Sequence, residues 1–545
     1  MIKIPAILAA DAYKMSHRKQ YNPDTSVVYS TWTPRKSRLS GVEEVVVFGI
    51  QYFIKSYLID CFNQTFFSRP KAEVMSEFKR IMKSYGDTDV SHWESLYDLG
   101  YLPLKIDSLE EGSLCPIRVP MFTIQNTKPE FYWLTNFIET IMSTEIWKPM
   151  TSATIAREYR KLLEEWAEKT CDDNSHVDFQ AHDFSMRGMA GLDAACSSGA
   201  GHLLFFKGSD TIPATFWLEA FYNANVDEEL VGCSIPATEH SVAEANIIAF
   251  QESIDAEELQ FLDWDTRKAA ELLYMERLLA CYPEGVFSYV ADTYNLWEVL
   301  TDILPLLKQN IISREGKMVI RPDSGDPVDI ICGLNSNSHY SDALAMGSAH
   351  RDAECDIMLS RYFGMYSEDF DKSPYKDAME KGVIELLWDT FGGSINSKGY
   401  KVLDPRIGCI YGDAITLERA SEICARLEQK GFASSNIVLG VGSYTYNMNT
   451  RDTFGFALKT TYGCVNGKEL MLYKDPITDD GTKKSQKGMV AVIENSEGRL
   501  ELRDELNAED LKFIQDNKLK TVFLDGVLTN ETSLEEIRTR VKRSL

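Results

Sequence analysis

The sequence predicts an α/β protein in which a barrel of parallel strands lies beside a second, mixed α/β domain. Between residues 176 and 460, short β-rich runs that end in Gly, Asp, Ser or Arg alternate with helical patterns. This alternation is typical of parallel strands connected by helices. Residues 1–175 lack it and combine short β-rich runs with long helical patterns. We therefore expect a barrel domain over residues 176–460 and a separate domain over residues 1–175.

The composition indicates a large globular protein without a membrane or nucleic-acid partner. The chain has 545 residues, of which 44% are hydrophobic, and its 57 basic and 82 acidic residues give a net charge of −25. This negative charge argues against non-specific binding to nucleic acid or anionic lipid. No apolar run is long enough to cross a bilayer. The 11 cysteines show neither Cys-x-x-Cys pairs nor zinc spacing, which favours a reducing, cytoplasmic location.

The first domain is expected to contain a sheet and two long helices. Its β-rich runs cover residues 27–31 and 45–49, and its helical patterns cover residues 130–146 and 152–169. The apolar run at residues 4–10 imitates a signal peptide only faintly, because charged residues follow it directly. We expect it to be a buried segment of the mature protein.

The tail from residue 461 is expected to complete this first domain. It carries a hairpin pattern, in which residues 489–493 pair with residues 500–502, and a closing helix after Thr532.

Seven strand and helix units are expected in the barrel domain. Their strands are predicted at residues 177–184, 203–206, 230–235, 286–291, 317–320, 406–411 and 436–439. Residues 334–380 interrupt the alternation and are interpreted as an inserted surface excursion. The insertion could cover a site, aid assembly or have no visible role.

Polar clusters follow the predicted strands at the carboxyl ends, where barrels of this kind hold their active sites. They contain Arg187, Asp210, His240, Asp292, Arg321, Asp323 and Asp413. In the densest cluster, Arg321 offers a planar donor fork for an anion, while Asp323 and Asp326 can accept from ribose hydroxyls or metal-bound water. Pro-Asp-Ser-Gly is also an ordinary turn sequence, so this cluster alone does not decide the function.

A ligand with a phosphate, a ribose and a diphosphate would find candidate partners for each group. Gly440, Gly442 and Ser443 could offer backbone N–H groups to a phosphate, and Asp323, Gly412 and Asp413 could hold ribose hydroxyls. Mg²⁺ could be held partly by Asp292 or Asp323. The missing third glycine argues against a dinucleotide site and an NAD-dependent dehydrogenase. The candidate cations for the diphosphate are Arg35, Arg187, Arg321, Arg451, Lys459 and Lys474.

Motifs in order along nearly the whole chain closely resemble the nicotinamide phosphoribosyltransferase family. They are DAYK at 11–14 with His17, Gln20 and Tyr21, HDFSMRG at 182–188, FKGSDT at 206–211, SIPATEHS at 234–241, RPDSG at 321–325, GD at 412–413, TRD at 450–452 and KDP at 474–476.

The resemblance implies a type II phosphoribosyltransferase fold, with an irregular (β/α) barrel and a mixed α/β domain built from the N-terminal and C-terminal segments. It also implies a homodimer with active sites across its interface. The implied reaction is a pentosyl transfer, in which nicotinamide and phosphoribosyl pyrophosphate give nicotinamide mononucleotide and pyrophosphate for NAD salvage. Mg²⁺ would assist, and ATP would act as an activating co-substrate.

The resemblance also assigns roles to individual residues. Phe184 and the partner chain's Tyr13 would stack on the pyridine ring, with about 0.5–1.5 kcal/mol from stacking. Asp323, Asp292 and Arg321 would stabilise the cationic sugar, the metal and the departing diphosphate. The residues expected around the amide are Arg187, Asp210, Ser288 and Arg321.

Asp210 is the residue expected to choose the substrate. Its carboxylate would accept from the amide of nicotinamide and repel nicotinate by roughly 4 kcal/mol, about a thousandfold. This estimate requires that Asp210 is neither protonated nor paired with Arg187.

His240 matches a histidine that ATP phosphorylates in the resembling family. Imidazole is nucleophilic enough near neutral pH for this step. The other interpretation is that His240 orients Glu239 or contacts pyrophosphate.

Ser443 and Tyr444 depart from the family pattern, which continues with glycines, and would narrow the phosphate loop. Two alternative functions remain at this point. One is a nicotinate phosphoribosyltransferase, and the other is a nucleotide-binding protein of the same fold without catalytic activity.

Overall fold

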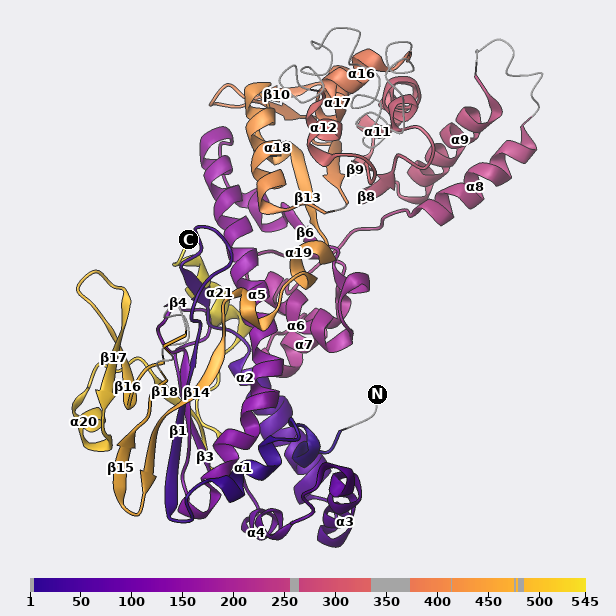
Figure 1. Cartoon of the computed structure of the whole chain (residues 1–545). Coiled ribbons are helices and arrows are strands. Elements are labelled where there is room, and N and C mark those ends of the chain that lie inside the picture. The colour runs from indigo at the N-terminus through magenta and orange to yellow at the C-terminus, as the bar shows by residue number, and fades with distance from the viewer. Residues whose placement is uncertain (1–3, 255–263, 335–372, 413, 475–476, 479–484) are drawn as a thin grey trace, which may run out of the picture.

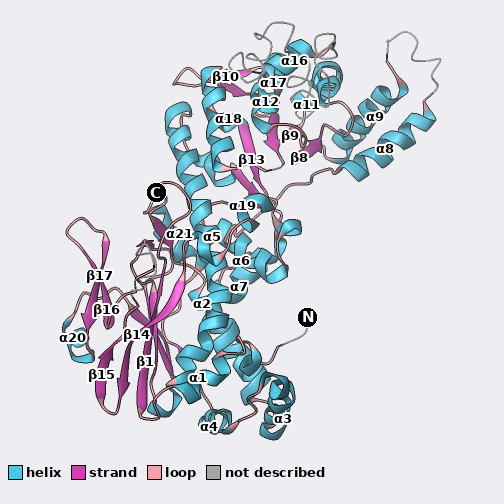
Figure 2. Cartoon of the chain, viewed as in Figure 1, coloured by secondary structure: helices cyan, strands magenta, loops and turns pink. Residues whose placement is uncertain are grey.

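The computed structural model describes residues 4–254, 264–334, 373–412, 414–474, 477–478 and 485–545. Figure 2 shows two principal sheets, each accompanied by helices. In Figure 1 the parallel sheet lies in the upper half and the antiparallel sheet at the lower left. Helix α5 (Trp133–Thr170) connects the two parts. This arrangement confirms the expected fold class, a parallel barrel-like domain beside a mixed domain.

The upper sheet contains six strands in the order β7-β6-β13-β12-β9-β8, and every neighbouring pair is parallel. Parallel pairing places all carboxyl ends at one edge. Short apolar runs form these strands because both faces of the sheet are buried. The strands are β6 (Ala181–Asp183), β7 (Gly208–Ser209), β8 (Glu284–Val290), β9 (Glu315–Arg321), β12 (Ile407–Tyr411) and β13 (Ile437–Val441).

Residues 230–238, here called the closing segment, join the two edges of this sheet. Cys233 forms a parallel bridge with Gly208 of β7, and Ala237 forms one with Ser288 of β8. The closing segment therefore connects the edge strands and closes the sheet into an irregular barrel. It was predicted to contain a regular strand at residues 230–235, but its described strand pairing is limited to these isolated bridges.

The lower sheet is built from both ends of the chain, as expected. Its order is β15-β14-β1-β5-β3-β18-β19, so strands after residue 456 flank strands before residue 127 on both sides. Trp32 of β1 is fully buried and stacks between Phe122 and Phe456, with ring centroids 5.7 and 5.4 Å away. The strands are β1 (Thr25–Thr33), β3 (Leu104–Ser108), β5 (Phe122–Asn126), β14 (Ala457–Val465), β15 (Lys468–Met471), β18 (Lys520–Leu524) and β19 (Val527–Leu528).

Three shorter antiparallel pairs accompany the main sheets. The predicted tail hairpin is confirmed, since Val492 pairs with Leu502 and Ile493 with Glu501. The predicted run at residues 45–49 is shorter than expected, because its strand ends at Val46. The pairs are β16 (Met489–Glu494) with β17 (Leu500–Leu506), β2 (Glu44–Val46) with β4 (Leu114–Pro116), and β10 (Gly393–Ile395) with β11 (Lys401–Leu403).

Helix α5 is one helix of 38 residues, where the sequence predicted two. Pro149 lies inside it, although proline removes a backbone donor and usually breaks a helix. The first half packs into the hydrophobic core of the mixed domain and the second half into the barrel core. A Cβ atom on Gly49 would lie 2.5 Å from the ring of Pro149, so a glycine makes room for the proline. Burial of both halves of α5 in hydrophobic cores therefore overrides the tendency of Pro149 to break the helix.

The predicted strand at residues 203–206 is also wrong. These residues form the turn after helix α6 (Leu192–His202), and β7 begins later, at Gly208. All four side chains are buried, so their apolar character reflects core packing of a turn. A short apolar run does not distinguish a strand from a buried connection. Of the predicted insertion at 334–380, residues 335–372 lie outside the described part of the chain.

The remaining helices surround the sheets. Ser533 caps the last helix through a reciprocal bond pair with Glu536, which explains the predicted closing helix. Asp326 caps α12 through the N–H groups of Val328 and Asp329, so its carboxylate is used structurally rather than for ribose. Among the described helices, none combines the length and apolar composition of a bilayer span.

The barrel helices are α6, α7 (Ile212–Tyr222), α8 (His240–Ser253), α9 (Thr266–Cys281), α10 (Leu296–Glu298), α11 (Leu304–Ile312), α12 (Pro327–Cys332), α16 (Lys376–Lys381), α17 (Val383–Phe391), α18 (Leu417–Gln429) and α19 (Ser443–Asn447). Those of the mixed domain are α1 (Lys14–Gln20), α2 (Ile50–Phe53), α3 (Lys71–Met82), α4 (Ser91–Leu99), the first half of α5 and α20 (Ala508–Phe513), while α21 (Leu534–Lys542) packs against the barrel core.

Candidate functional site

The carboxyl ends of β6 and β7 and the closing segment bring three side chains into one hydrogen-bonded group. His182 Nε2 lies 2.8 Å from Asp210 Oδ1, and the Ser234 hydroxyl donates to the same oxygen. Burial raises the pKa of the Asp210 carboxyl, but the bonds from His182 and Ser234 and the charge of Arg321 hold the pKa below its ordinary value. Asp210 is therefore an oriented carboxylate at neutral pH.

This geometry meets both conditions on the predicted role of Asp210. The carboxyl is ionised, and its described hydrogen-bond partners are His182 and Ser234 rather than Arg187. Arg187 lies in the exposed 3₁₀ turn Met186–Gly188 that follows β6.

An aromatic ring lies against His182, and two buried donors lie on the neighbouring strands β8 and β9. Phe184 follows β6 directly, is only partly buried, and places its ring centroid 4.5 Å from that of His182. Arg321 at the end of β9 donates through Nη2 to the Thr238 carbonyl at 3.1 Å. The Ser288 hydroxyl and Arg321 Nε are buried without a partner in the described part of the chain. Buried polar atoms without a protein partner can be satisfied by a bound water, ion or ligand.

A second group joins the loops after β8 and β9 to helix α8. Asp292 is nearly buried, with its Oδ1 3.1 Å from His240 Nε2, and its Oδ2 accepts from the Asp323 N–H at 3.0 Å. His240 is the first residue of α8 and its side chain is 40% exposed, so one edge of the imidazole remains accessible. Asp292 thus orients both the histidine and the loop that carries Asp323.

The Asp323 carboxylate faces the loop after β12. A Cβ atom on Gly412 would lie 2.2 Å from Asp323 Oδ1, so a larger residue there would displace this carboxylate from its present position. Arg321 Nη1 lies 4.0 Å from the same oxygen. Asp413, predicted to act with Gly412, lies outside the described residues.

The predicted phosphate loop follows β13. Gly440 lies against the backbone of the β12 loop, where an added Cβ would come within 2.5 Å of the Tyr411 carbonyl oxygen. Gly442 precedes the short helix α19, and Ser443 points toward Gly188, whose added Cβ would lie 2.0 Å from Ser443 Oγ. The Ser443 side chain thus fills space beside the Arg187 loop.

The other predicted cations gather on the mixed domain, not at the barrel. Burial lowers the pKa of the Lys459 ammonium, and the charges of Arg35, Lys14 and Arg451 lower it further against the opposing charge of Glu139. Lys459 lies on β14, 3.7 Å from Glu139 of α5. Arg35, Arg451 and Lys459, with Lys14, are here called the cation group.

Tyr13 belongs to the same region. It precedes α1, its side chain is largely exposed, and the Lys14 ammonium lies 5.3 Å from its ring centroid. In Figure 1, α1 and β14 lie in the lower half, whereas β8 and β9 lie near the top. Lys474 is exposed after β15, and its backbone N–H donates to the Ser485 hydroxyl at 2.9 Å. The predicted residues therefore form two groups on two domains of one chain.

Sequence reasoning missed the residues that hold the predicted ones. His182 and Ser234 orient Asp210, Thr238 holds Arg321, and Lys14 joins the cation group. His182 could have been found, because it lies two positions before Phe184 and alternate strand residues share a face. Nothing local indicated the partners of Ser234 or Thr238.

Two family models match the chain. The nicotinate phosphoribosyltransferase (NAPRTase) family matches residues 179–526, and the N-terminal domain of nicotinamide phosphoribosyltransferase matches residues 5–106. A nicotinamide phosphoribosyltransferase of Acinetobacter baylyi is 44% identical over 559 residues, which cover 100% of this chain and 98% of that protein. One from Mycoplasma pneumoniae is 33% identical, with 88% and 94% covered.

A solved structure shares the fold. The nicotinate-nucleotide pyrophosphorylase of Pyrococcus furiosus superposes with a TM-score of 0.52 at 12% sequence identity, with 99% of this chain and 95% of that chain covered.

Proposed function

Because this chain belongs to the nicotinate phosphoribosyltransferase family and carries the N-terminal domain of nicotinamide phosphoribosyltransferases, we propose that it makes nicotinamide mononucleotide for NAD salvage. The pyridine nitrogen of nicotinamide attacks the anomeric carbon of phosphoribosyl pyrophosphate. The bond from that carbon to the diphosphate oxygen breaks, and pyrophosphate leaves with both electrons. The observation that carries this proposal is the ionised Asp210, held by His182 and Ser234 beside Phe184.

The Asp210 carboxylate selects the amide. An ionised carboxylate accepts from an amide NH₂ group but repels the carboxylate of nicotinate. Phe184 supplies a flat surface for the pyridine ring. The Ser288 hydroxyl and Arg321 Nε, which have no partner among the described residues, would hydrogen-bond to the polar atoms of the amide.

The chain's own groups stabilise the charges that develop as the bond breaks. Asp323 lies beside Gly412, where a ribose would be held, and favours positive charge on the sugar. Asp292 and Asp323 are neighbours, and no set of three or more potential ligands occurs within the described residues. Two carboxylates without a full protein cage suit Mg²⁺ that is shared with substrate phosphates. Such an ion would supply charge stabilisation for the departing diphosphate.

The cation group supports a homodimer with shared sites. Arg35, Arg451 and Lys459 lie on the mixed domain with Tyr13, apart from the barrel site of the same chain. A second copy that presents this group to the barrel would supply the diphosphate contacts and the second aromatic ring. His240, oriented by Asp292 and partly exposed, is the group that ATP would phosphorylate. Free thiols such as those of Cys115, Cys332 and Cys409 fit a cytoplasmic location.

One assay tests the proposed reaction. Purified protein is given phosphoribosyl pyrophosphate and Mg²⁺ with nicotinamide or nicotinate, with and without ATP, and mononucleotide formation is followed. We expect the nicotinamide product to dominate, and Asp323→Ala to lose at least about 100-fold in turnover with folding intact. Asp516→Ala, which removes an exposed carboxylate of the C-terminal segment, is the control and should leave turnover unchanged. Ligand binding without turnover in the wild-type protein would instead support a silent binding protein.

A further inference from the structure

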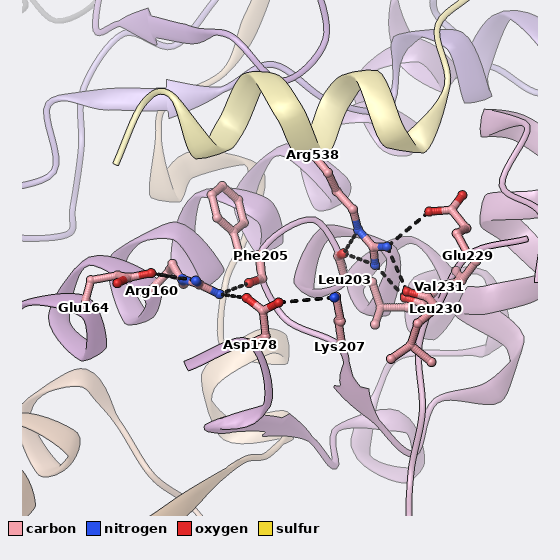
Figure 3. Close-up of polar contacts among 10 residues, drawn as sticks. All are labelled: Arg160, Glu164, Asp178, Leu203, Phe205, Lys207, Glu229, Leu230, Val231 and Arg538. Atoms are coloured by element: carbon pink, nitrogen blue, oxygen red, sulfur yellow. Dashed lines mark hydrogen bonds and ion pairs between the residues drawn. The ribbon is translucent and has the colours of Figure 1, made fainter. Parts of the chain in front are cut away.

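The amino ends of β6, β7 and the closing segment are held by an ionic network that has no part in the site described above. Figure 3 shows that the network contains two arginines from distant helices, Arg160 of α5 and Arg538 of α21. It lies at the opposite strand ends from His182, Asp210 and Ser234, which come from the same three pieces of chain.

Arg160 and Lys207 fix β6 against β7. Arg160 Nη1 donates to Asp178 Oδ1 at 2.6 Å and to the Phe205 carbonyl at 3.0 Å. Lys207 Nζ lies 3.2 Å from Asp178 Oδ2, and its backbone N–H donates to the Asp178 carbonyl at 2.7 Å. The segments that lead into β6 and β7 therefore share one carboxylate.

Arg538 fixes the closing segment against the segment that leads into β7. Its Nε and Nη2 donate to the Leu203 carbonyl at 3.0 and 2.8 Å, and its Nη1 and Nη2 donate to the Leu230 and Val231 carbonyls at 3.0 and 2.5 Å. Glu229 Oε2 lies 3.4 Å from Nη1. A planar guanidinium can bind carbonyls of two segments at once in a fixed geometry.

The first residues of the closing segment depend on this contact, because the described main-chain bonds from the segment to β7 and β8 begin only at Cys233. Its described strand pairing consists of the two bridges at Cys233 and Ala237, without a continuous ladder on either side. Arg538 holds its first two residues, and the Pro236 carbonyl accepts from the Ser288 N–H at 2.8 Å near its end. Between these anchors the Cys233 N–H donates to the Lys207 carbonyl at 2.8 Å, and the Cys233 carbonyl accepts from the Ser209 N–H at 2.9 Å. Ser234 follows Cys233, three residues after Val231, and donates to Asp210.

We propose that Arg538 is a positioning residue for the choice of nicotinamide over nicotinate, acting through the closing segment that carries Ser234. This inference rests on the proposed function. Loss of Arg538 removes the side-chain donor from the Leu203, Leu230 and Val231 carbonyls, so the start of the closing segment shifts to find other partners. Ser234 then moves from Asp210, and the carboxylate loses one of the two bonds that orient it.

The test compares variants of two arginines on the same helix. Arg540 lies two residues after Arg538, but it donates to the Glu111 carbonyl and lies 3.3 Å from Glu110, both in the mixed domain. For each variant we would measure kcat/KM with nicotinamide and with nicotinate, together with the melting temperature. We expect Arg538→Ala to lower the nicotinamide preference about tenfold, the worth of one oriented hydrogen bond to a charge, and Arg540→Ala to leave it unchanged. Arg538→Lys should restore part of the preference.

A double-mutant cycle shows whether Arg538 acts through Ser234. If it does, Arg538→Ala with Ser234→Ala lowers the preference no further than Ser234→Ala alone. If the two substitutions lower the nicotinamide preference additively, the proposal is overturned. It is also overturned if Arg538→Ala keeps the wild-type preference while its melting temperature falls as in Arg540→Ala.

If Arg538→Ala does not fold, the same comparison uses Arg538→Lys, with amide hydrogen exchange across residues 230–238 as an activity-independent readout. Faster amide exchange across residues 230–238 together with a lower nicotinamide preference supports the proposal. A wild-type exchange rate or a wild-type preference overturns it. A wild-type protein that makes no mononucleotide refutes the proposed function itself, before any variant is needed.

Discussion

Replacing Asp210 by serine should erode the preference for nicotinamide over nicotinate, because the repulsion of the nicotinate carboxylate disappears. The carboxylate is ionised, and His182 and Ser234 fix its position, so its charge is present where the amide would bind. Asp210→Asn keeps the shape of the side chain and removes only the charge. The two variants together separate the electrostatic effect from the loss of side-chain volume.

The structure lowers the expected repulsion between Asp210 and the nicotinate carboxylate below the value estimated from sequence alone. Two like charges about 4 Å apart repel by about 4 kcal/mol at an effective dielectric near 20, and by about 1 kcal/mol in water. The Asp210 side chain is 45% exposed, so solvent screens part of this repulsion. We therefore expect a contribution of about 2 kcal/mol, or roughly a 30-fold preference, instead of a thousandfold one.

The measurement is the ratio of kcat/KM for the two bases at constant ionic strength. Asp227→Ser is the matched control, since it removes an exposed carboxylate of the same domain and changes the net charge equally. Asp210→Ser and Asp210→Asn should both lower the ratio by about 30-fold, and Asp227→Ser should leave it unchanged. If Asp210→Asn keeps the full wild-type preference, the carboxylate charge does not select the substrate and the electrostatic reasoning is wrong.

Two further predictions concern the cation group and a buried acid. Lys459→Gln should raise the KM for phosphoribosyl pyrophosphate about tenfold or more, because one charge-assisted bond to the diphosphate is lost, and should leave the KM for nicotinamide near its wild-type value. Lys468→Gln on the exposed strand β15 is the control. Equal effects of the two variants on the KM for phosphoribosyl pyrophosphate would contradict the role of the cation group. Burial raises the pKa of the Glu271 carboxyl from 4.5 to about 7. A carboxyl whose pKa is raised by folding stabilises the fold below pH 4.5, and this stabilisation is lost as the pH rises through 7. The free energy of unfolding of Glu271→Gln should therefore exceed that of the wild type by up to about 3 kcal/mol at pH 8 and by little at pH 4.5. Urea unfolding at both pH values measures this difference, exposed Glu276→Gln is the comparison, and an equal gain at the two pH values would show that Glu271 is not the titrating group.

The sequence predicted the strands whose ends carry polar residues, and it failed where packing decides the structure. The strands β6, β8, β9, β12 and β13 were expected because each short apolar run ends in turn residues. Residues 203–206 have the same character, but they are buried as a turn. The sequence predicted two helices separated by residues 147–151, which include Pro149, yet packing into two hydrophobic cores keeps α5 continuous through this proline. Local sequence patterns therefore predict which residues are buried more reliably than they predict whether those residues form a strand, a helix or a turn.

The site shows the same limit at the level of chemistry. Residue type and strand-end position indicated Asp210, Arg321 and Asp323, because parallel strands collect their carboxyl ends at one edge. Asp326 satisfied the same criteria but caps α12, since a carboxylate before a helix serves the first free N–H groups. The cation group met the criterion of charge but lies on the other domain. Position along the chain therefore identifies candidates, whereas the partner of each carboxylate decides its use.

The selectivity group illustrates why a partner can be invisible to local sequence. His182, Asp210 and Ser234 meet only if β6, β7 and the closing segment keep their relative register, since a parallel neighbour that slips moves its end residue away. Main-chain pairing holds this register, and Arg160 and Arg538 contact the far ends of the same pieces of chain. The two arginines lie 22 residues before His182 and more than 300 residues after Ser234 in the chain. Neither arginine is near a motif, and each donates to main-chain carbonyls that exist at every position. Substrate choice in this fold is thus expected to respond to substitutions at the barrel end that no substrate reaches.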